Sequence, residues 1–388
     1  MPIKKTARKK RGNRKGFTTG ACTAAAARAA TLGLVTGEVQ DSVLCRLPNK
    51  TDVSFKVESF FLESGHARAV VIKDAGDDPD VTDKAHITVD IYLKEIKELK
   101  IFDNPCDEIR EKIKLLNGPG VGVVTQAGLG LEVNGPAINP VPQKNIRENV
   151  SAVAGDLLDK YNFEIIISVP DGEKMAKRTL NARLGIIAGI SILGTSGIVH
   201  PWSTAAFRSS VIQAIEVAVS QEQKIIVLTT GGRTEKFIIG ELPELPSVCF
   251  VQMGDFLKVA LDTVVNSGIK RIVIGAMVGK LAKMAQGENI THARKNPINM
   301  KMVSEIAQAA GAGDEVVEDI AQADTARYAS ERMSEIGLLN EFYLYLAKKV
   351  MQTLLEKYDQ QFSLKIMICD FEGNKQLELD SEQYTHVL

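Results

Sequence analysis

The sequence lacks the patterns that would assign its function to disulfides, a metal centre or a membrane span. Its five cysteines are scattered, odd in number and contain no Cys-x-x-Cys pair. This argues against a disulfide framework or a zinc site and favours a reducing cytoplasm. The five histidines are also scattered, so we predict no metal site. No apolar run reaches the roughly 18 residues of a transmembrane helix, so we predict no membrane association.

A strong net charge is absent as well. Lys and Arg number 47 against 48 Asp and Glu, a formal net charge of -1. The chain therefore has no overall attraction to nucleic acid or to an anionic surface. The exception is the stretch from Lys4 to Lys15, which is basic and contains no acid. Such a stretch is either an arm for an anionic partner or a solvated tail, and we predict a disordered tail over residues 1–15.

The length and composition predict two domains of ordinary globular type. The chain has 388 residues, of which 45% are hydrophobic and 24% charged. We expect an N-terminal α+β domain with antiparallel strands at 16–160. We expect an α/β domain with a mostly parallel sheet at 161–388.

The pattern of the first domain is one helix followed by alternating strands. Thr19 to Leu34 is rich in alanine, which favours a helix, with Thr18 or Thr19 as its N-cap and Gly33 as its C-cap. The hydrophobic period then changes to two, which predicts strands at 39–47, 53–61, 67–73 and 86–93. Residues 117–142 are rich in glycine and proline, and a long loop of this kind is usually functional.

The second domain alternates short strands with helices. We predict strands at 164–169, 225–229, 248–252, 271–275 and 364–369, helices at 203–221 and 255–267, and several helices within 299–357. This alternation is typical of a parallel sheet that is covered on both faces.

Polar residues crowd the end of one predicted strand of the second domain. Strand 225–229 runs into Thr230-Gly231-Gly232-Arg233-Thr234-Glu235. Ligands of open α/β sheets bind beyond the carboxyl ends of the strands. Adjacent glycines allow a ligand to approach the backbone, and an arginine can pair with a carboxylate or phosphate. The alternative is a Gly-Gly turn with surface charges, and we favour the ligand site.

Strand 271–275 leads into Gly275-Ala276-Met277-Val278-Gly279-Lys280. This resembles a phosphate loop but lacks its Gly-x-x-x-x-Gly-Lys-Ser/Thr spacing, so a P-loop NTPase is not predicted. Lys280 is either an anion ligand or a lysine at a helix start. Gly194-Thr195-Ser196-Gly197 is either a cofactor cradle or a connecting loop.

Two further segments of the first domain have a structural and a chemical interpretation. The aspartate-rich stretch 74–83 lacks the order of a calcium loop and is better read as a turn, although a catalytic carboxylate within it stays open. Cys22 follows a helix start, which lowers a thiol pKa, but a buried small residue is the favoured interpretation.

Six stretches, taken in order, closely resemble the cobalt-precorrin-5B C-1-methyltransferase family of anaerobic cobalamin biosynthesis. They cover the chain from about residue 16 to 290, and the part after about 300 matches loosely. The stretches are GFTTGACTAAAA at 16–27, DAGDDPDVT at 74–82, GVGVVTQAGLGLEVNGPAINPVP at 120–142, NARLGIIAGISILGTSGIV at 181–199, TTGGRTEKF at 229–237 and GAMVGKLAKMAQG at 275–287. The chain departs from the family pattern at Ala182, at Asn134-Gly135 and at Thr291-His292.

The resemblance implies an S-adenosylmethionine-dependent C-methyltransferase that converts cobalt-precorrin-5B to cobalt-precorrin-6A. The substrate's carboxylates would need Arg, Lys or backbone N–H partners. From their places at strand ends and helix starts, we predict cofactor contacts at Thr230, Gly231, Gly232, Arg233, Glu235, Gly275 and Lys280, and substrate contacts at Thr18, Thr19, Gly20 and Asn139.

We assign no catalytic residue. The sulfonium of the cofactor already activates the methyl group, so no covalent nucleophile is required, and the identity of any catalytic base stays open. The alternatives are a non-catalytic tetrapyrrole carrier and an enzyme that uses a phosphorylated ligand on the same loops. Neither a nucleic acid nor a membrane is an expected partner. The oligomeric state stays open, and a homo-oligomer is one alternative.

Overall fold

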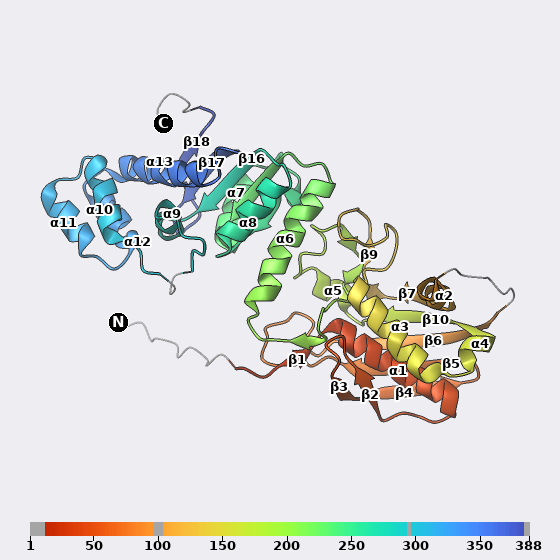
Figure 1. Ribbon diagram of the computed structural model, residues 1–388. Helices are drawn as coiled ribbons and strands as arrows, with labels where there is room; N and C mark the ends of the chain where they lie inside the picture. Colours follow the sequence, from red (N-terminus) through yellow and green to blue (C-terminus); the bar gives the residue numbers. More distant parts are fainter. Residues whose placement is uncertain (1–11, 97–103, 293–295, 384–388) are drawn as a thin grey trace. The chain divides into compact units, whose positions relative to one another are not determined.

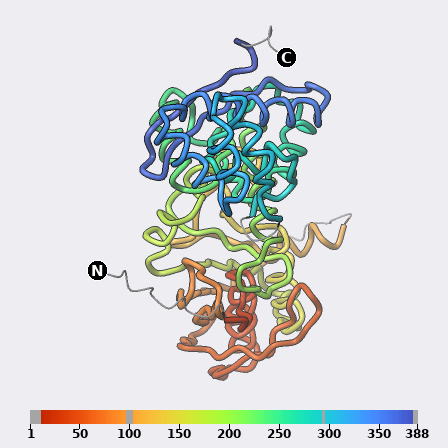
Figure 2. Tube along the Cα trace, turned by 90° about the vertical axis from the view of Figure 1, so that its left-hand side faces the viewer, coloured from red at the N-terminus to blue at the C-terminus, as the bar shows by residue number. Residues whose placement is uncertain are grey.

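The structure, a computed structural model, describes residues 12–96, 104–292 and 296–383. The chain forms two compact units that divide after Thr204. Each unit is one continuous stretch of the sequence, as the colours of Figures 1 and 2 show. We had placed the boundary at 160/161. The difference arises because residues 161–204 return to the first unit and pair with strands there.

A five-stranded sheet forms the centre of the first unit, and its order is β4-β5-β6-β10-β7. The neighbouring strands are antiparallel except for β10 and β7, which are parallel. This confirms the predicted α+β class with antiparallel strands. The strands are β4 (Ser59–Glu63), β5 (His66–Ile72), β6 (His86–Glu95), β7 (Ile113–Asn117) and β10 (Tyr161–Ser168).

The assignment of strand 164–169 to the second sheet was wrong. This segment is part of β10, which pairs with β6 along its whole length, from Tyr161 to Ser168. A short run of isoleucines has the same appearance in either kind of sheet, so periodicity alone does not identify its partner.

Helix α1 (Thr19–Thr36) is buried on nearly all sides between this sheet and helix α3 (Pro140–Ala154). A helix covered on every side needs small apolar residues rather than an amphipathic pattern, which accounts for its alanines. Its N-cap is Thr18, as predicted, whose Oγ1 accepts a hydrogen bond from the amide of Ala21 at 3.1 Å. The other helices of the first unit are α2 (Pro105–Lys112), α4 (Leu157–Lys160) and α5 (Gly172–Ala176).

The predicted C-cap of α1, Gly33, was wrong. The helix continues for one more turn to Gly37, which has a φ of 71° and donates its amide to the Gly33 carbonyl at 2.8 Å. Gly33 is required for another reason: a Cβ at this position would lie 2.4 Å from Cζ of Phe60. Two glycines four residues apart thus have different duties, one in packing and one in capping.

Short strands complete the first unit. The hairpin of β2 (Ser42–Arg46) and β3 (Asp52–Lys56) is present, but the predicted strand 53–61 divides into β3 and β4, which belong to different sheets. The region 117–142 is not free of regular structure. The short pairs are β1 (Gly16–Phe17) with β13 (Ile198–Val199), β8 (Gly120–Val121) with β12 (Gly189–Ile190), and β9 (Val123–Val124) with β11 (Ile186–Ile187).

The second unit contains a five-stranded sheet of order β15-β14-β16-β17-β18. The first four strands are parallel, which confirms the predicted α/β class, and β18 is antiparallel to β17. Residues such as Leu228, Ile274 and Ile366 are fully buried, as expected for strands covered on both faces. The strands are β14 (Ile225–Thr229), β15 (Phe250–Gln252), β16 (Arg271–Ala276), β17 (Ser363–Cys369) and β18 (Lys375–Asp380).

Helices connect and cover this second sheet. The chain moves from β14 to the edge strand β15 and then returns past β14 to β16, so the two connections run in opposite directions along the sheet. Because such crossovers are right-handed, α7 and α8 lie on opposite faces. Among the described residues, no helix is both long enough and apolar enough to cross a membrane. The helices are α6 (Thr204–Ser220), α7 (Gly232–Glu241), α8 (Leu257–Asn266), α9 (Val278–Ala285), α10 (Met300–Ala309), α11 (Asp314–Ala321), α12 (Ala326–Glu335) and α13 (Leu339–Lys357), with the short 3-10 helix η1 (Ser247–Cys249).

Candidate active site

The strand order of the second unit creates a topological switch point between β14 and β16. Thr229 of β14 pairs with Gly275 of β16, so the loops that follow these two residues leave the sheet side by side. Open α/β sheets bind ligands at such a point, outside the carboxyl ends of the strands. Two segments that the sequence analysis selected, 230–235 and 275–280, are therefore brought together.

The start of helix α7 is open. A Cβ added at Gly231 or Gly232 would meet nothing within 4 Å. The amides of Gly232 and Arg233 lie in the first turn and have no hydrogen-bond acceptor among the described residues. Free amides at a helix start can hold an anion or a polar group, and here the space for such a group is clear.

Thr234 fixes this loop, a role that the sequence analysis missed. Its Oγ1 accepts the amide of Gly231 at 3.1 Å and donates to the Gly231 carbonyl at 2.8 Å. Thr230 Oγ1 lies 3.4 Å from the same hydroxyl. The available signal was its position, because a residue three places after an N-cap is where a polar side chain folds back to the cap.

Arg233 and Gly275 differ in what surrounds them. The side chain of Arg233 is exposed and has no hydrogen-bond or ion-pair partner among the described residues, so its guanidinium is available to a ligand. Gly275 is buried, and a Cβ there would lie 1.9 Å from Cδ1 of Ile238 in α7. The glycine is thus explained by the packing of α7 on β16.

Glu235 and Lys280 turn towards the protein. Glu235 is buried and its carboxylate accepts a hydrogen bond from the side chain of Gln252 at the end of β15. Lys280 forms an ion pair with Asp255 and donates to the Thr291 carbonyl at 2.9 Å. Both groups tie the loop after β15 to its neighbours, and their predicted ligand contacts stay predictions.

A second lysine, which the sequence analysis did not select, holds the segment after α9. Lys283 is only 3% exposed, and its ammonium donates to the carbonyls of His292 and Asn296. Burial, followed by the nearby charge of Lys280, lowers the pKa of Lys283. Together, Lys280 and Lys283 fasten this segment beside the end of β15.

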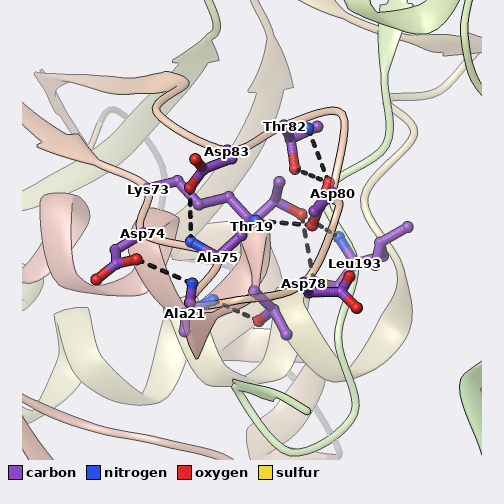
Figure 3. A network of polar contacts seen from close by, with 12 residues as sticks. Thr19, Ala21, Lys73, Asp74, Ala75, Asp78, Asp80, Thr82, Asp83 and Leu193 are labelled. Atoms are coloured by element: carbon purple, nitrogen blue, oxygen red, sulfur yellow. Dashed lines mark hydrogen bonds and ion pairs between the residues drawn. The ribbon is translucent and has the colours of Figure 1, made fainter. Parts of the chain in front are cut away.

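In the first unit, three of the six family-like stretches meet around the start of α1 (Figure 3). Phe17 donates its amide to the Asp74 carbonyl at 2.7 Å, and Gly20 donates to the Leu193 carbonyl at 3.0 Å. Thr19 Oγ1 accepts the Leu193 amide at 2.9 Å. The segments 16–20, 73–83 and 191–199 thus form one hydrogen-bonded cluster, which we call the motif cluster.

The predicted substrate residues Thr18, Thr19 and Gly20 lie inside the motif cluster. All three are buried, and the Thr18 amide donates to the Gly197 carbonyl at 3.0 Å. The hydroxyls of Thr18 and Thr19 and the amides of Thr18 and Gly20 have partners within the chain. The geometry therefore gives them a structural duty, and contact with a substrate carboxylate stays a prediction.

An ion pair between a buried lysine and a partly buried aspartate anchors the aspartate-rich turn, which has the predicted turn structure. Lys73 is 1% exposed, and its Nζ lies 2.7 Å from Asp80 Oδ2. Asp80 Oδ1 also accepts the amide and the hydroxyl of Thr82, each at 2.7 Å. Burial alone raises the pKa of Asp80, but the Lys73 charge and these hydrogen bonds outweigh it, so the pKa lies below its ordinary value.

Arg14, which we had assigned to the disordered tail, belongs to the same turn. Its guanidinium forms an ion pair with Asp74, and its backbone amide donates to Asp77 Oδ2 at 2.6 Å. The hydrogen bond from Arg14, followed by one from the Gly76 amide, lowers the pKa of Asp74. The predicted tail is therefore too long by the residues from Gly12 on, and residues 1–11 lie outside the described part.

The surroundings of Asn139 and Cys22 bear on their predicted roles as a ligand contact and a nucleophile. Asn139 precedes α3, its amide donates to the Ile192 carbonyl at 2.9 Å, and its side chain has no hydrogen-bond partner among the described residues. This leaves its side-chain amide available to a ligand. Cys22 is fully buried, and burial raises the pKa of its thiol to about 12, which excludes the nucleophile interpretation.

The geometry describes a two-unit protein with a candidate ligand site at a parallel-sheet switch point and a hydrogen-bonded cluster of motifs in its other unit. Comparison with known proteins identifies the family. Sequence profiles described as CbiD and as CbiD, C-terminal domain, match residues 6–201 and 290–376. This chain belongs to the CbiD family, which confirms the resemblance inferred from its motifs.

Similar proteins extend over nearly the whole chain. A protein of Methylococcus capsulatus named cobalt-precorrin-5B C(1)-methyltransferase is 58% identical over 97% of this chain and 95% of its own length. A protein of the same name from Polaromonas naphthalenivorans is 55% identical, over 94% and 97%. The crystal structure of a cobalamin biosynthesis protein, CbiD of Archaeoglobus fulgidus, is 29% identical, covers 71% of this chain and 81% of its own, and has a TM-score of 0.37.

Proposed function

We propose that this chain transfers a methyl group from S-adenosylmethionine to carbon 1 of cobalt-precorrin-5B, giving cobalt-precorrin-6A. The observation that carries the proposal is the identity of 54–58% over at least 94% of the chain to proteins that bear the name of this methyltransferase. An identity of this size over both units, rather than over one, supports the same reaction and not only the same fold.

The switch point of the second unit fits the methyl donor. The amides of Gly232 and Arg233 would donate hydrogen bonds to the carboxylate of its methionine part, and the exposed Arg233 guanidinium would pair with the same group. Thr230 stands beside them at the end of β14. When bound, S-adenosylmethionine supplies a methyl group that its sulfonium already activates.

The protein's part in the reaction is then to bind and orient. Holding two reactants in line contributes up to about 7–11 kcal/mol to a reaction of this kind. A covalent nucleophile on the protein is not required, which agrees with the burial of Cys22. In the first unit, we assign Thr18, Thr19 and Gly20 to holding the loop at 191–197, and Asn139 to a ligand contact.

One anaerobic assay tests the proposal. The purified full chain is incubated with cobalt-precorrin-5B and S-adenosylmethionine that carries a deuterated methyl group, and the product is analysed by mass spectrometry. We expect a product that is heavier by the labelled methyl group in place of one hydrogen, and none without the donor. Binding of the tetrapyrrole without any mass change would establish a carrier instead, and ATP turnover would establish an enzyme for a phosphorylated ligand.

A further inference from the structure

The first unit contains a groove of about 850 Å³ that is separate from the motif cluster. It lies between helix α2, the loop at 130–132 and the outer face of α3. Its size falls within the range of small-molecule sites. It is lined by Cys106, Ile109, Arg110, Gly130, Leu131, Glu132, Pro140, Gln143, Lys144, Arg147, Glu148, Ser151 and Ala152.

The groove exists because α3 has two different faces. Asn145, Ile146 and Val150 are buried on the face that packs against α1. Gln143 and Arg147 lie one helical turn apart on the opposite side, so their side chains form a stripe along the groove. The loop at 130–132 belongs to the family-like stretch 120–142, which the motif cluster does not account for.

The charges of the lining are not balanced. It contains three cations, Arg110, Lys144 and Arg147, and two carboxylates, of Glu132 and Glu148. Lys144 Nζ lies 3.8 Å from Glu148 Oε1, and Arg110 Nη1 lies 3.9 Å from Asp107 Oδ1. Both distances are too long for a hydrogen bond. Both cations therefore keep most of their hydrogen-bonding capacity for a ligand.

Arg147 is the central observation. Its Nε donates to the Ile113 carbonyl and its Nη1 to Gln143 Oε1, both at 3.2 Å, so its partners are neutral. Among the described residues, Nη2 has no hydrogen-bond partner and the guanidinium has no carboxylate partner. Burial, followed by the charge of Arg110, lowers the pKa of Arg147. A partly buried cation beside a second cation is unfavourable until an anion joins them.

The rest of the lining indicates what kind of anion fits. The Oγ atom of Ser151 is buried and has no hydrogen-bond partner among the described residues. Ile109, Leu131 and Pro140 add apolar surface to the same walls. Cations beside apolar surface suit an organic polycarboxylate with an apolar body better than they suit an inorganic anion.

We infer that this groove binds the tetrapyrrole substrate through its carboxylate arms, with Arg147 as the principal ligand and Arg110 and Lys144 beside it. The identity of the ligand as a tetrapyrrole rests on the proposed function. The inference that the ligand carries a carboxylate rests on the Arg147 guanidinium alone and does not depend on the proposed function. The assignment also supplies the cationic partners that the buried residues Thr18 to Gly20 do not provide.

Binding of a stable probe tests the groove. Uroporphyrin III, a tetrapyrrole polycarboxylate, is titrated into the full chain, and quenching of its fluorescence gives the Kd. Because a charge-assisted hydrogen bond is lost, we expect Arg147→Gln to weaken binding roughly ten-fold or more, and Arg110→Gln about three-fold. The matched control is Arg46→Gln, which removes an exposed arginine paired with Asp52 at 3.0 Å outside the groove and should leave the Kd unchanged.

Two results would overturn the inference: an unchanged Kd in Arg147→Gln, and displacement of the porphyrin by equimolar inorganic phosphate, which would mean a site for simple anions. If Arg147→Gln does not fold by circular dichroism, Arg147→Lys is used. Arg147→Lys keeps the charge but loses the planar guanidinium, so it should weaken porphyrin binding by a smaller factor than Arg147→Gln. If Arg147 only supports the fold, the Kd of the folded Arg147→Lys protein should equal that of the wild type.

The methyl-transfer assay separates this inference from the proposed function. In the folded Arg147→Gln enzyme, we expect the KM for cobalt-precorrin-5B to rise roughly ten-fold, while kcat and the KM for S-adenosylmethionine stay unchanged. Methyl transfer with an unaltered KM would refute the groove and leave the function intact. Porphyrin binding that depends on Arg147, without methyl transfer by the wild-type chain, would refute the function and leave the groove intact.

Discussion

Two glycine- and threonine-rich segments, 16–20 in the first unit and 230–234 in the second, each include the start of a helix and have similar compositions, yet their surroundings are opposite. A Cβ at Gly16 would lie 2.1 Å from the carbonyl carbon of Ala75, whereas one at Gly232 would meet nothing within 4 Å. Thr19 bonds to the distant loop at Leu193, whereas Thr234 bonds only within its own turn. The first segment joins parts of the chain, and the second leaves donors open for a ligand.

The largest expected effect is on the ion pair of Lys73 and Asp80 in the first unit. Asp80→Asn leaves the ammonium of Lys73, which is 1% exposed, without its ion-pair partner. Removing one partner of such a pair lowers the free energy of unfolding by about 3–5 kcal/mol. Urea titration followed by circular dichroism measures the change, and Asp41→Asn, at an exposed position, is the matched control with an expected change within about 0.5 kcal/mol.

The same variant tests how the free energy of unfolding depends on pH. The pKa of Asp80 is lowered in the folded protein, so its stabilising contribution is present above the ordinary value of 3.8 and is lost as the pH falls through the lower folded value. The wild type should therefore lose stability relative to Asp80→Asn as the pH is lowered below about 4. Parallel urea titrations of the two proteins at several pH values would contradict this if the difference between them did not shrink.

A pair of glycine substitutions tests the comparison directly. Gly16→Ala places its methyl group against the backbone of Ala75, which cannot move aside, and should lower the free energy of unfolding by about 1–3 kcal/mol. Gly232→Ala enters open space and should change it by less than about 0.5 kcal/mol. Thermal unfolding of both variants gives the result, and equal losses of Tm would remove the distinction between the two segments.

Thr19→Val probes whether the motif cluster holds structure or substrate. The valine keeps the shape but removes the acceptor of the Leu193 amide, so we expect a loss of about 1–3 kcal/mol in the free energy of unfolding. The KM for cobalt-precorrin-5B should not change in the folded fraction. A raised KM with unaltered stability would instead support the original prediction that Thr19 contacts a substrate carboxylate.

The smallest expected change in free energy is at the switch point. Arg233→Ala removes an exposed guanidinium without a partner among the described residues, so stability should not change, whereas the Kd for S-adenosylmethionine should rise roughly ten-fold, equivalent to about 1.4 kcal/mol. Isothermal titration calorimetry measures the affinity. Lys236→Ala removes an exposed cation of the same helix and is the control. Identical affinities in all three proteins would show that Arg233 is not a ligand.

Much of the fold could be predicted because its signals are local. The alanines of α1, the hairpin at 42–56 and the alternation of the second unit each depend on neighbouring residues. The pairing of β10 could not be predicted, because its partners β6 and β7 are distant in the sequence and its isoleucines suit either sheet. The strand β18 was missed because an edge strand with charged residues such as Lys375 and Glu378 has a weak hydrophobic pattern.

The place of the candidate loops at the strand ends could be predicted, but the direction of their side chains could not. The place of Gly231 and Gly232 follows from one strand end, which a local pattern reveals. The partners of Glu235 and Lys280, which are Gln252 and Asp255, come from the end of β15 and the loop after it. The groove has no sequence signal of its own, because Arg110 of α2 and Arg147 of α3 are distant in the sequence and come together only in the folded unit.

The pairing of β1 with β13 has a consequence for how the protein is made. Gly16 and Val199 are opposite each other, so the first and last strands of the first unit are paired. On a ribosome, α1 would emerge long before its final partners at Leu193 and Gly197, and the motif cluster could assemble only after residue 199 had left the exit tunnel. Non-local closure of this kind slows folding, so the nascent first unit should depend on chaperones more than the second.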